Sequence, residues 1–495
     1  MAPPPEPSSP RGKRAGFWLF LGHLATIFSI AISNILLALT VLSLPWTRRR
    51  NVPWAALKPL TVPLGLYVLF LAGSVAASSD PLTSARGLTE TFTLSTLLMA
   101  PLLVRNERQV RLVVDALIGV AALLACAGLS QYLYGYGAID RRIRGPFSHY
   151  MTFSGLLLVA DLLLLASMVY AGRWRTPWRW AALAAINVAL IGSYTRGAWV
   201  ALALALTVLV LVRAPRLLAL YVPAAVLLVA LAPVPLLHRV ISITDLRDTS
   251  NYDRLCMLEA GLAMVRERPL FGLGPELVER RYAIYRSPSA PRYEVPHLHN
   301  NLVQLAAERG LPALASYLGL TLASAVVAGR LFSREGGRRG PRADLYVGVL
   351  LALLAFNLAG LFENNWGDTE VQRPVLFVLA LPFCLLIREE GEGYIETCGT
   401  GIAVAALAAR KGNASGKSAV LTPSDDLKRG RERTALRLDQ LLVDRGLFPS
   451  REQARRAVMA GTVEVEGRRV DKPGTAVQGE ARVQVLAPKE PFVSR

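Results

Sequence analysis

The sequence contains few charged residues for its length. Asp, Glu, Lys and Arg make up 18% of the 495 residues and hydrophobic residues make up 53%, whereas soluble domains are about a quarter charged. Charged residues are sparse from about residue 17 to 388 and dense after that. This distribution argues against several ordinary soluble domains. It predicts a polytopic membrane protein with a small, separate, basic domain at its C-terminus.

Cysteines and nucleotide-binding motifs are also scarce. The four cysteines show neither metal-ligand spacing nor a disulfide framework; they are Cys126, Cys256, Cys384 and Cys398. The sequence has no Walker loop and no glycine-rich dinucleotide motif, so it indicates no ATP-driven chemistry of its own. Residues 1–16 are rich in proline and lack a signal-cleavage pattern, so we expect a disordered cytoplasmic N-terminus and a first apolar run that stays in the protein.

Eleven apolar runs are long enough to be considered as membrane spans. The first is too long for one helix and has basic residues on both sides, so we expect two short helices that turn near Ser33 and Asn34. The prediction is therefore an all-α membrane domain of about twelve spans over residues 17–388. The runs are 17–44, 62–78, 87–104, 112–134, 149–171, 178–194, 197–213, 216–236, 302–329, 343–362 and 373–388.

Basic residues in the short loops predict the orientation of these spans. Segment 330–342 has five Arg and one Glu and is assigned to the cytoplasm. Alternation then places both ends of the chain in the cytoplasm and residues 237–300 and 363–372 outside. The net charge of +19 lies mainly in short loops and at the two ends. It is typical of a membrane protein and does not by itself indicate nucleic-acid binding.

Polar residues gather at the predicted outer face, where their cost in a membrane usually marks a function. Arg196 stands in SYTRGAW, Arg254 on a helical stretch of the outer loop, and His297 and His299 in PHLHNN. Each has a plainer interpretation, such as an interfacial or solvated arginine or a structural histidine. Together they suit a polyanionic lipid-linked substrate such as a diphosphate. No carboxylate or cysteine stands at metal-ligand spacing, so no metal site is predicted.

These segments together resemble the O-antigen ligase and polymerase family over roughly residues 17–388. The family's histidine signature corresponds to His299, Asn300, nine residues, Gly310, and then Leu311, Pro312 and Ala313, of which only Ala313 departs from the usual pattern. The other matching pieces are RGPFSHYMTF (144–153), SYTRGAW (193–199), RPLFGLGP (268–275) and ENNWGDTEV (363–371).

The resemblance implies a metal-independent, inverting glycosyl transfer that needs no cofactor, on the periplasmic face of a bacterial inner membrane. The donor would be a glycan on undecaprenyl diphosphate, and the acceptor a lipid A-core sugar hydroxyl. His299 would be the general base, and Arg196 and Arg254 would bind the diphosphate. His297 is the alternative base, and Arg144 and Arg268 are secondary candidates.

Other functions remain open on the sequence alone. A polymerase of O-antigen or another surface polysaccharide would use the same motifs, with a second lipid-linked glycan as its acceptor. So would a protein glycosyltransferase. A membrane transporter is an alternative of another class, but it should place polar groups near mid-membrane in broken helices. The outer-edge position of the polar residues favours an enzyme.

The C-terminal segment has a different pattern. Residues 389–434 are expected to be a polar linker, and residues 435–488 a compact α+β unit with two amphipathic helices followed by strands. This unit resembles the RNA-binding domain first named in ribosomal protein S-four, in the version of hemolysin-type ribosomal RNA methyltransferases. The resemblance implies a basic face toward RNA, formed by Arg451, Arg455 and Arg456. No methyltransferase-like segment follows, so no cofactor site is predicted. A bifunctional protein, a gene fusion and a frame error all remain open.

Overall fold

In the computed structural model the chain forms two compact units. The predicted linker 389–434 lies outside the described residues, so the boundaries drawn there stay predictions. Within the first unit the description covers residues 10–47, 54–135, 142–230, 233–245 and 247–386. Within the second it covers residues 435–445, 447–448, 451–459, 461, 463–466, 468–472, 474–478 and 483–485.

Every predicted apolar run corresponds to at least one helix. The first run corresponds to two, and the run 302–329 is divided at Gly310 into α15 (Asn301–Arg309) and α16 (Leu311–Arg334). These helices are α1 (Pro10–Ala25), α2 (Ile30–Leu42), α4 (Trp54–Ala76), α6 (Glu90–Leu103), α7 (Glu107–Leu133), α8 (Tyr150–Tyr170), α9 (Pro177–Gly192), α10 (Arg196–Arg213), α11 (Leu218–Ala230), α16 (Leu311–Arg334), α17 (Ala343–Ala359) and the helix Thr369–Leu386. Among the described residues, six helices are long and apolar enough to cross a membrane: α4, α7, α8, α10, α16 and Thr369–Leu386. The total of twelve spans therefore stays a prediction.

The first apolar run turns earlier than the sequence suggested. The turn ends at Ser29, whose side chain caps α2, and Ser33 is buried inside α2. The Ser33 hydroxyl donates to the backbone oxygen of His23, 2.8 Å away on α1. Because a buried hydroxyl needs such a partner, Ser33 marks the contact between the two helices and not their turn. In addition, α1 begins at Pro10, so the disorder expected for residues 10–16 is wrong; proline is well tolerated in a first helical turn.

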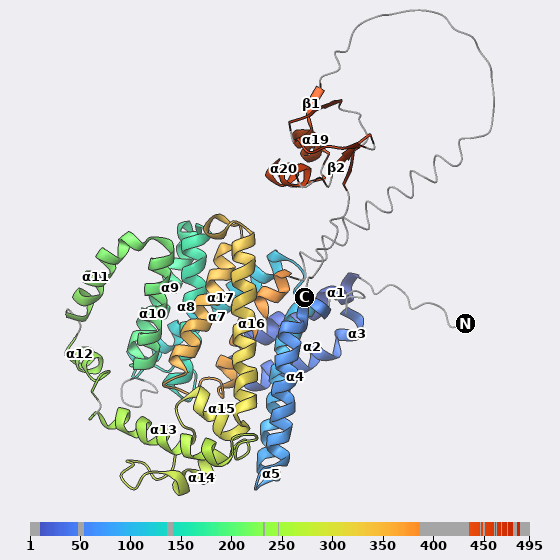
Figure 1. Ribbon diagram of the computed structural model, residues 1–495. Helices are drawn as coiled ribbons and strands as arrows, with labels where there is room; N and C mark the ends of the chain where they lie inside the picture. Colours follow the sequence, from blue (N-terminus) through green and yellow to red (C-terminus); the bar gives the residue numbers. More distant parts are fainter. Residues whose placement is uncertain are drawn as a thin grey trace, which may run out of the picture. The chain divides into compact units, whose positions relative to one another are not determined.

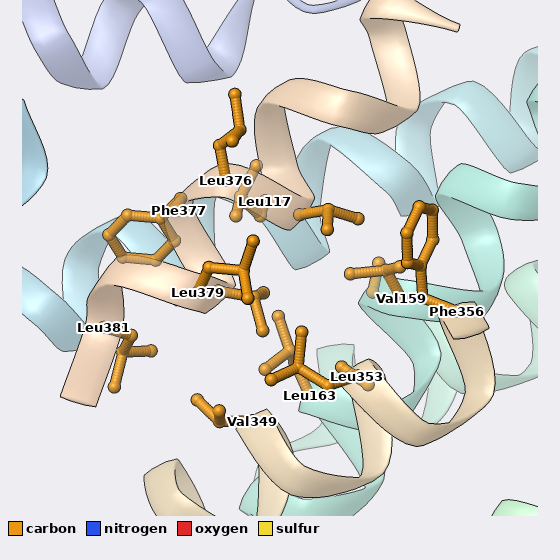
Figure 2. Packing of buried hydrophobic residues seen from close by; sticks show 14 of the residues in the cluster. Leu117, Val159, Leu163, Val349, Leu353, Phe356, Leu376, Phe377, Leu379 and Leu381 are labelled. Carbon is orange, nitrogen blue, oxygen red and sulfur yellow. The ribbon is translucent and has the colours of Figure 1, made fainter. Parts of the chain in front are cut away.

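The core of the first unit is formed by α7, α8, α17 and the helix Thr369–Leu386. Figure 2 shows side chains from these helices in one apolar cluster, including Leu117 of α7, Val159 of α8, Phe356 of α17 and Leu379 of Thr369–Leu386. The most apolar window of α8 is 89% buried, which explains why apolar residues surround this helix instead of forming a stripe. The helices α7, α9, α10 and α17 pack against this buried helix.

At one end of the bundle, three loops that were predicted to be cytoplasmic come together. Nη1 of Arg111, in α7, lies 2.7 Å from an Asp344 oxygen at the start of α17. Asp115, also in α7, accepts hydrogen bonds from Arg173 and Arg179, which flank the start of α9. Loops far apart in the sequence therefore share one end of the bundle, as alternating spans require.

The opposite end carries the long segment that was predicted to lie outside. This segment contains most of α12 (Val234–Ile241), and it contains α13 (Thr249–Glu267) and α14 (Leu277–Tyr285), whereas α15 (Asn301–Arg309) occupies the start of the predicted apolar run 302–329. α13, α14 and α15 lie together at the end of the bundle where α16 begins (Figure 1). The backbone of the RPLFGLGP segment crosses α15, because the Leu273 amide donates to the Ala307 oxygen. Gly272 has a φ of +64°, and a Cβ there would lie 2.4 Å from the Glu308 backbone. Glycine is therefore required for this crossing.

Short elements connect the helices of the first unit. They are α3 (Leu44–Thr47), α5 (Pro81–Ser84), η1 (Ala85–Thr89), η3 (Arg173–Arg175), η4 (Pro215–Leu217) and η5 (Gly337–Arg339). The α5 segment reaches the outer segment, because Nη1 of Arg280, on α14, lies 2.9 Å from a carboxylate oxygen of Asp80. The end of α4 is thereby linked to α14.

The second unit is a small α+β domain with its own core. It contains β1 (Ala435–Arg437), α19 (Leu438–Asp444), α20 (Arg451–Met459), β2 (Val463–Val465), β3 (Arg468–Arg469), β4 (Ala476–Gln478) and β5 (Val483–Val485). β1 pairs antiparallel with β4, and β2 lies between β3 and β5. The core comprises Leu438, Leu441, Leu442, Ala454, Val458, Val463 and Val477. Two helices are followed by strands, as the sequence predicted, but a short strand that was not predicted, β1, precedes the helices.

Candidate active site

The asparagines of the PHLHNN segment fix the backbone around His299. The Asn300 side chain caps α15 by accepting from the amides of Leu302 and Val303. The Asn301 amide donates to the Gly360 oxygen, and its side-chain oxygen accepts from the Trp366 amide. The segment that follows α17 is thereby held against the start of α15, opposite His299.

These hydrogen bonds place one carboxylate, that of Glu363, in contact with both His299 and Arg254. Nδ1 of His299 lies 2.9 Å from Oε2 of Glu363, and Nη2 of Arg254 lies 2.5 Å from Oε1 of the same carboxylate. The Glu363 side chain is 4% exposed, so the two interactions occur with little competition from water. His299 has a φ of +49°. A non-glycine residue in this region is uncommon, and such strain is often found at functional sites.

These side chains line a cavity of about 200 Å³. Arg292 also lines it and forms an ion pair of 3.1 Å with Asp253, whose second oxygen is buried with no hydrogen-bond partner among the described residues. Thr152 contributes from the start of α8 and donates to Asp368 at 2.8 Å. The cavity is therefore formed by the start of α8 together with the segments 237–300 and 363–372, which were predicted to lie outside. Its lining comprises His149, Tyr150, Met151, Thr152, Ser250, Asp253, Arg254, Arg292, Pro296, His297, His299, Glu363, Asn364, Asn365 and Asp368.

Two groups in the cavity wall have shifted pKa values. Burial, together with the neighbouring His299, lowers the pKa of His297 to about 3. Burial raises the pKa of Asp368 to about 6, although the hydrogen bond from Thr152 opposes the shift. His297 is therefore neutral and a weak base near pH 7.

The structure does not place Arg196 in the wall of this cavity. Its side chain is buried, and its Nη1 donates to the Ser242 backbone oxygen at 2.8 Å. Its Nη2 lies 3.0 Å from Asp248, which caps the start of α13. Burial would raise the pKa of Asp248, but the Arg196 interaction outweighs it and lowers that pKa. Arg196 thus holds the helix that carries Arg254.

The secondary candidates divide in a similar way. His297 lines the cavity, and its ring centroid is 4.3 Å from that of His299. Arg144 and Arg268 are not among the lining residues. Arg144 instead donates to the Ser148 backbone oxygen at 3.1 Å, and Arg268 follows the last residue of α13.

Sequence reasoning missed the role of two acids. Glu363 and Asp368 stand in the ENNWGDTEV segment, which was recognised only as a matching piece and given no role. Glu363 is 64 residues from His299, so spacing could not reveal their contact. The available signal was the position of this segment, directly after an apolar run and on the same predicted side as PHLHNN.

Comparison with known proteins gives two matches in different parts of the chain. Residues 180–318 match the family described as O-Antigen ligase, and residues 436–483 match the S4 domain. The chain contains an O-antigen ligase domain and an S4 domain. His299, Arg254 and Arg196 lie within the first match, whereas Glu363 lies beyond it. The O-antigen ligase match supports a membrane glycosyltransferase of the ligase or polymerase type.

The S4 region also has a curated relative. A Bacillus subtilis (strain 168) protein, YqxC, which is named as an rRNA methyltransferase, is 46% identical over 59 residues. The matched stretch covers 12% of this chain and 21% of that relative. The chain thus spans about a fifth of the relative's length, and the likeness concerns the S4 region alone.

The three predicted RNA-binding arginines of the S4 domain are exposed on α20. Arg451 forms an ion pair of 3.0 Å with Asp439, which is buried in α19. Arg451 therefore also links α20 to α19. Arg455 and Arg456 follow on the same helix.

Proposed function

We propose that this protein is an O-antigen ligase-type glycosyltransferase. It moves a glycan from undecaprenyl diphosphate to a sugar hydroxyl of lipid A core, at the periplasmic face of a bacterial inner membrane. The observation that carries the proposal is the contact of one buried carboxylate, Glu363, with both His299 and Arg254 in the cavity wall. The ligase match of residues 180–318 supports the reaction class.

In the proposed reaction His299 is the general base. When its Nδ1 proton is donated to Glu363, the lone pair of Nε2 is left to accept a proton. The acceptor hydroxyl gives its proton to Nε2 while its oxygen attacks the anomeric carbon of the donor. The bond from that carbon to the phosphate oxygen breaks, in a single displacement that inverts the configuration. The lowered pKa of His297 makes it the weaker choice of base.

Arginines would stabilise the negative charge that develops on the leaving diphosphate. Nη2 is the Arg254 nitrogen with a described carboxylate contact, and a guanidinium has five N–H donors. Arg254 can therefore bind phosphate while it stays paired with Glu363. Arg196 would join by exchanging Asp248 for a phosphate oxygen, which would couple donor binding to the start of α13.

A complementation experiment tests this function. A deletion strain is rescued with the wild type, His299→Ala or Arg254→Lys, and with His238→Ala, a control histidine on α12 outside the cavity. Lipopolysaccharide and undecaprenyl-linked glycan are compared on gels, and protein levels by immunoblot. We expect His299→Ala to lose capped lipopolysaccharide while long lipid-linked chains accumulate. We expect Arg254→Lys to retain a small fraction of capping, because lysine keeps the charge but loses the guanidinium fork.

The other outcomes separate the alternatives. If only single lipid-linked repeats remain in the deletion strain, the protein is a polymerase that extends those repeats. If the lipid-linked glycan and the lipopolysaccharide are both unchanged by the deletion, the transferase proposal is wrong and a transporter becomes the better hypothesis. A well-expressed His299→Ala variant with wild-type capping would refute the assigned base.

For the S4 domain we propose a separate RNA-binding role through the exposed face of α20. Arg455 is the best test position, because Arg451 already forms the ion pair with Asp439. In filter-binding assays with ribosomal RNA, Arg455→Glu in the full chain should weaken binding about tenfold. Arg469→Glu, on β3 outside α20, is the charge-matched control. Equal losses in the two variants would refute the assigned face.

A further inference from the structure

A second cavity adjoins the one that contains His299 and has no part in the proposed donor site. Its volume is about 320 Å³, and ligand pockets are typically about 300–1,000 Å³. The two cavities share four lining residues: Pro296, His297, Asn364 and Asp368. They therefore meet at the segment that carries the proposed base.

Carboxylates outnumber cations in the wall of this second cavity. It is lined by two guanidinium groups, Arg86 and Arg309, and by five carboxylates, Glu90, Glu276, Glu279, Glu308 and Asp368. Arg309 is already paired, with Glu90 at 2.7 Å and Glu308 at 3.5 Å. A phosphate would meet net repulsion here. Sugar hydroxyl groups, in contrast, can donate to carboxylate oxygens.

The acids of this cavity have two different structural roles. Glu90 is fixed from inside by Trp366 and Gln372, which both donate to its Oε1 at 3.0 Å. Glu276 and Glu279, at the start of α14, are exposed. Glu276 has a φ of +65°, and its amide donates to Glu308 at 3.1 Å. The buried Glu308 thus fixes the backbone at Glu276. The side-chain carboxylates of Glu276 and Glu279 remain accessible to a ligand.

We propose that the second cavity binds the acceptor, as an uncharged terminal sugar whose hydroxyl groups donate to Glu276 and Glu279. A transfer between two substrates requires two sites that hold the reacting atoms close together. The two cavities meet at His297, two residues from His299. The inference rests on the proposed transferase function. It adds the location of the acceptor and the charge of its terminal sugar.

The test is a binding measurement on the full chain in nanodiscs, without donor. The probe is the core oligosaccharide released from the host strain's lipopolysaccharide, titrated by calorimetry. We expect Glu276→Gln combined with Glu279→Gln to raise the dissociation constant about tenfold. Glu259→Gln, an exposed glutamate of α13 that lines neither cavity, should leave it unchanged. Phosphorylating the probe's terminal sugar should weaken binding to the wild type about tenfold, and the double variant should lose most of this difference.

Several outcomes would overturn the assignment. They are no binding by the wild type, equal binding by the wild type and the double variant, and tighter binding of the phosphorylated probe. Since no donor is present, failure of the proposed function is seen separately. A protein that binds the oligosaccharide as expected but transfers no glycan keeps the acceptor cavity and loses the transferase role. A protein that transfers glycan, but whose binding is insensitive to the double variant, loses only the cavity assignment.

Discussion

The two ends of the helix bundle use the same kinds of side chain to different effect. At the end formed by the starts of α7, α9 and α17, Arg111, Arg173 and Arg179 pair with Asp344 and Asp115 and leave a space of only about 10 Å³. At the opposite end, Arg254 and Arg292 also pair with acids, yet the cavities there measure about 200 and 320 Å³. Ion pairs alone therefore do not mark a site.

The difference lies in what the acids contact besides arginine. At the closed end the carboxylates bind arginines from neighbouring loops, which joins those loops. At the open end Glu363 binds His299 with its second oxygen, and one oxygen of Asp253 has no described partner. A carboxylate that orients an imidazole beside a cavity can support proton transfer, whereas one enclosed by arginines serves packing.

The largest expected effect on transfer comes from Glu363→Gln. The amide keeps the shape of the side chain but cannot stabilise the imidazolium that forms as His299 takes a proton. We expect kcat per folded protein to fall about 100-fold or more. Stability should also fall by about 2 kcal/mol, because Arg254 loses its carboxylate partner. Transfer assays and thermal unfolding in nanodiscs measure both quantities. If unfolding shifts strongly while kcat per folded protein is kept, Glu363 resembles the acids of the closed end and the comparison fails.

A smaller effect on transfer is expected from Asp248→Asn. Removing the negative charge frees Arg196 for the diphosphate, so the KM for the lipid-linked donor should fall by about threefold to tenfold at low salt. Donor titrations at two salt concentrations measure the change. A donor KM that rises instead would mean that the pairing of Asp248 with Arg196 positions α13 for binding and does not compete with the substrate.

The sequence predicted those features that depend on local patterns. Apolar runs gave the helices, since a span has to be apolar along its whole length. His299 and Arg254 were proposed from motifs, and both line one cavity. Three loops that were assigned to one side contact one another. Contacts between distant segments were not predictable. Glu363 lies in a different loop from His299, so their contact could not be inferred from spacing. The pairing of Arg196 with Asp248 could not be predicted either, because nothing in the sequence distinguishes Asp248 from other acids in that polar segment. Ser33 was misplaced because a buried polar contact and a turn both favour serine.

At the closed end, Asp344→Asn should leave transfer per folded protein unchanged. Asp344 is buried, and among the described residues Arg111 would keep its contacts with Glu107 and Pro341. We expect a loss of about 2 kcal/mol of stability, because a partly buried guanidinium loses its main partner. Thermal unfolding together with initial rates tests this. A fall in kcat without a change in stability would show that the two ends are functionally coupled.

The smallest effect concerns pH and Asp368, which lines both cavities. Its pKa is raised by burial to about 6, above the ordinary value of 3.8. Since folding favours the neutral form, the resulting stability is fully present below pH 3.8 and is lost as the pH rises through 6.

Between pH 5 and 7.5 the wild type should therefore lose about 2–4 °C in Tm relative to Asp368→Asn, whose side chain stays neutral. The difference between the two profiles removes the contribution of other titrating groups. His297, with a pKa near 3, remains neutral throughout this range. Parallel profiles would mean that Asp368 is as well solvated as a surface acid, and the wall shared by the two cavities would then be open to water.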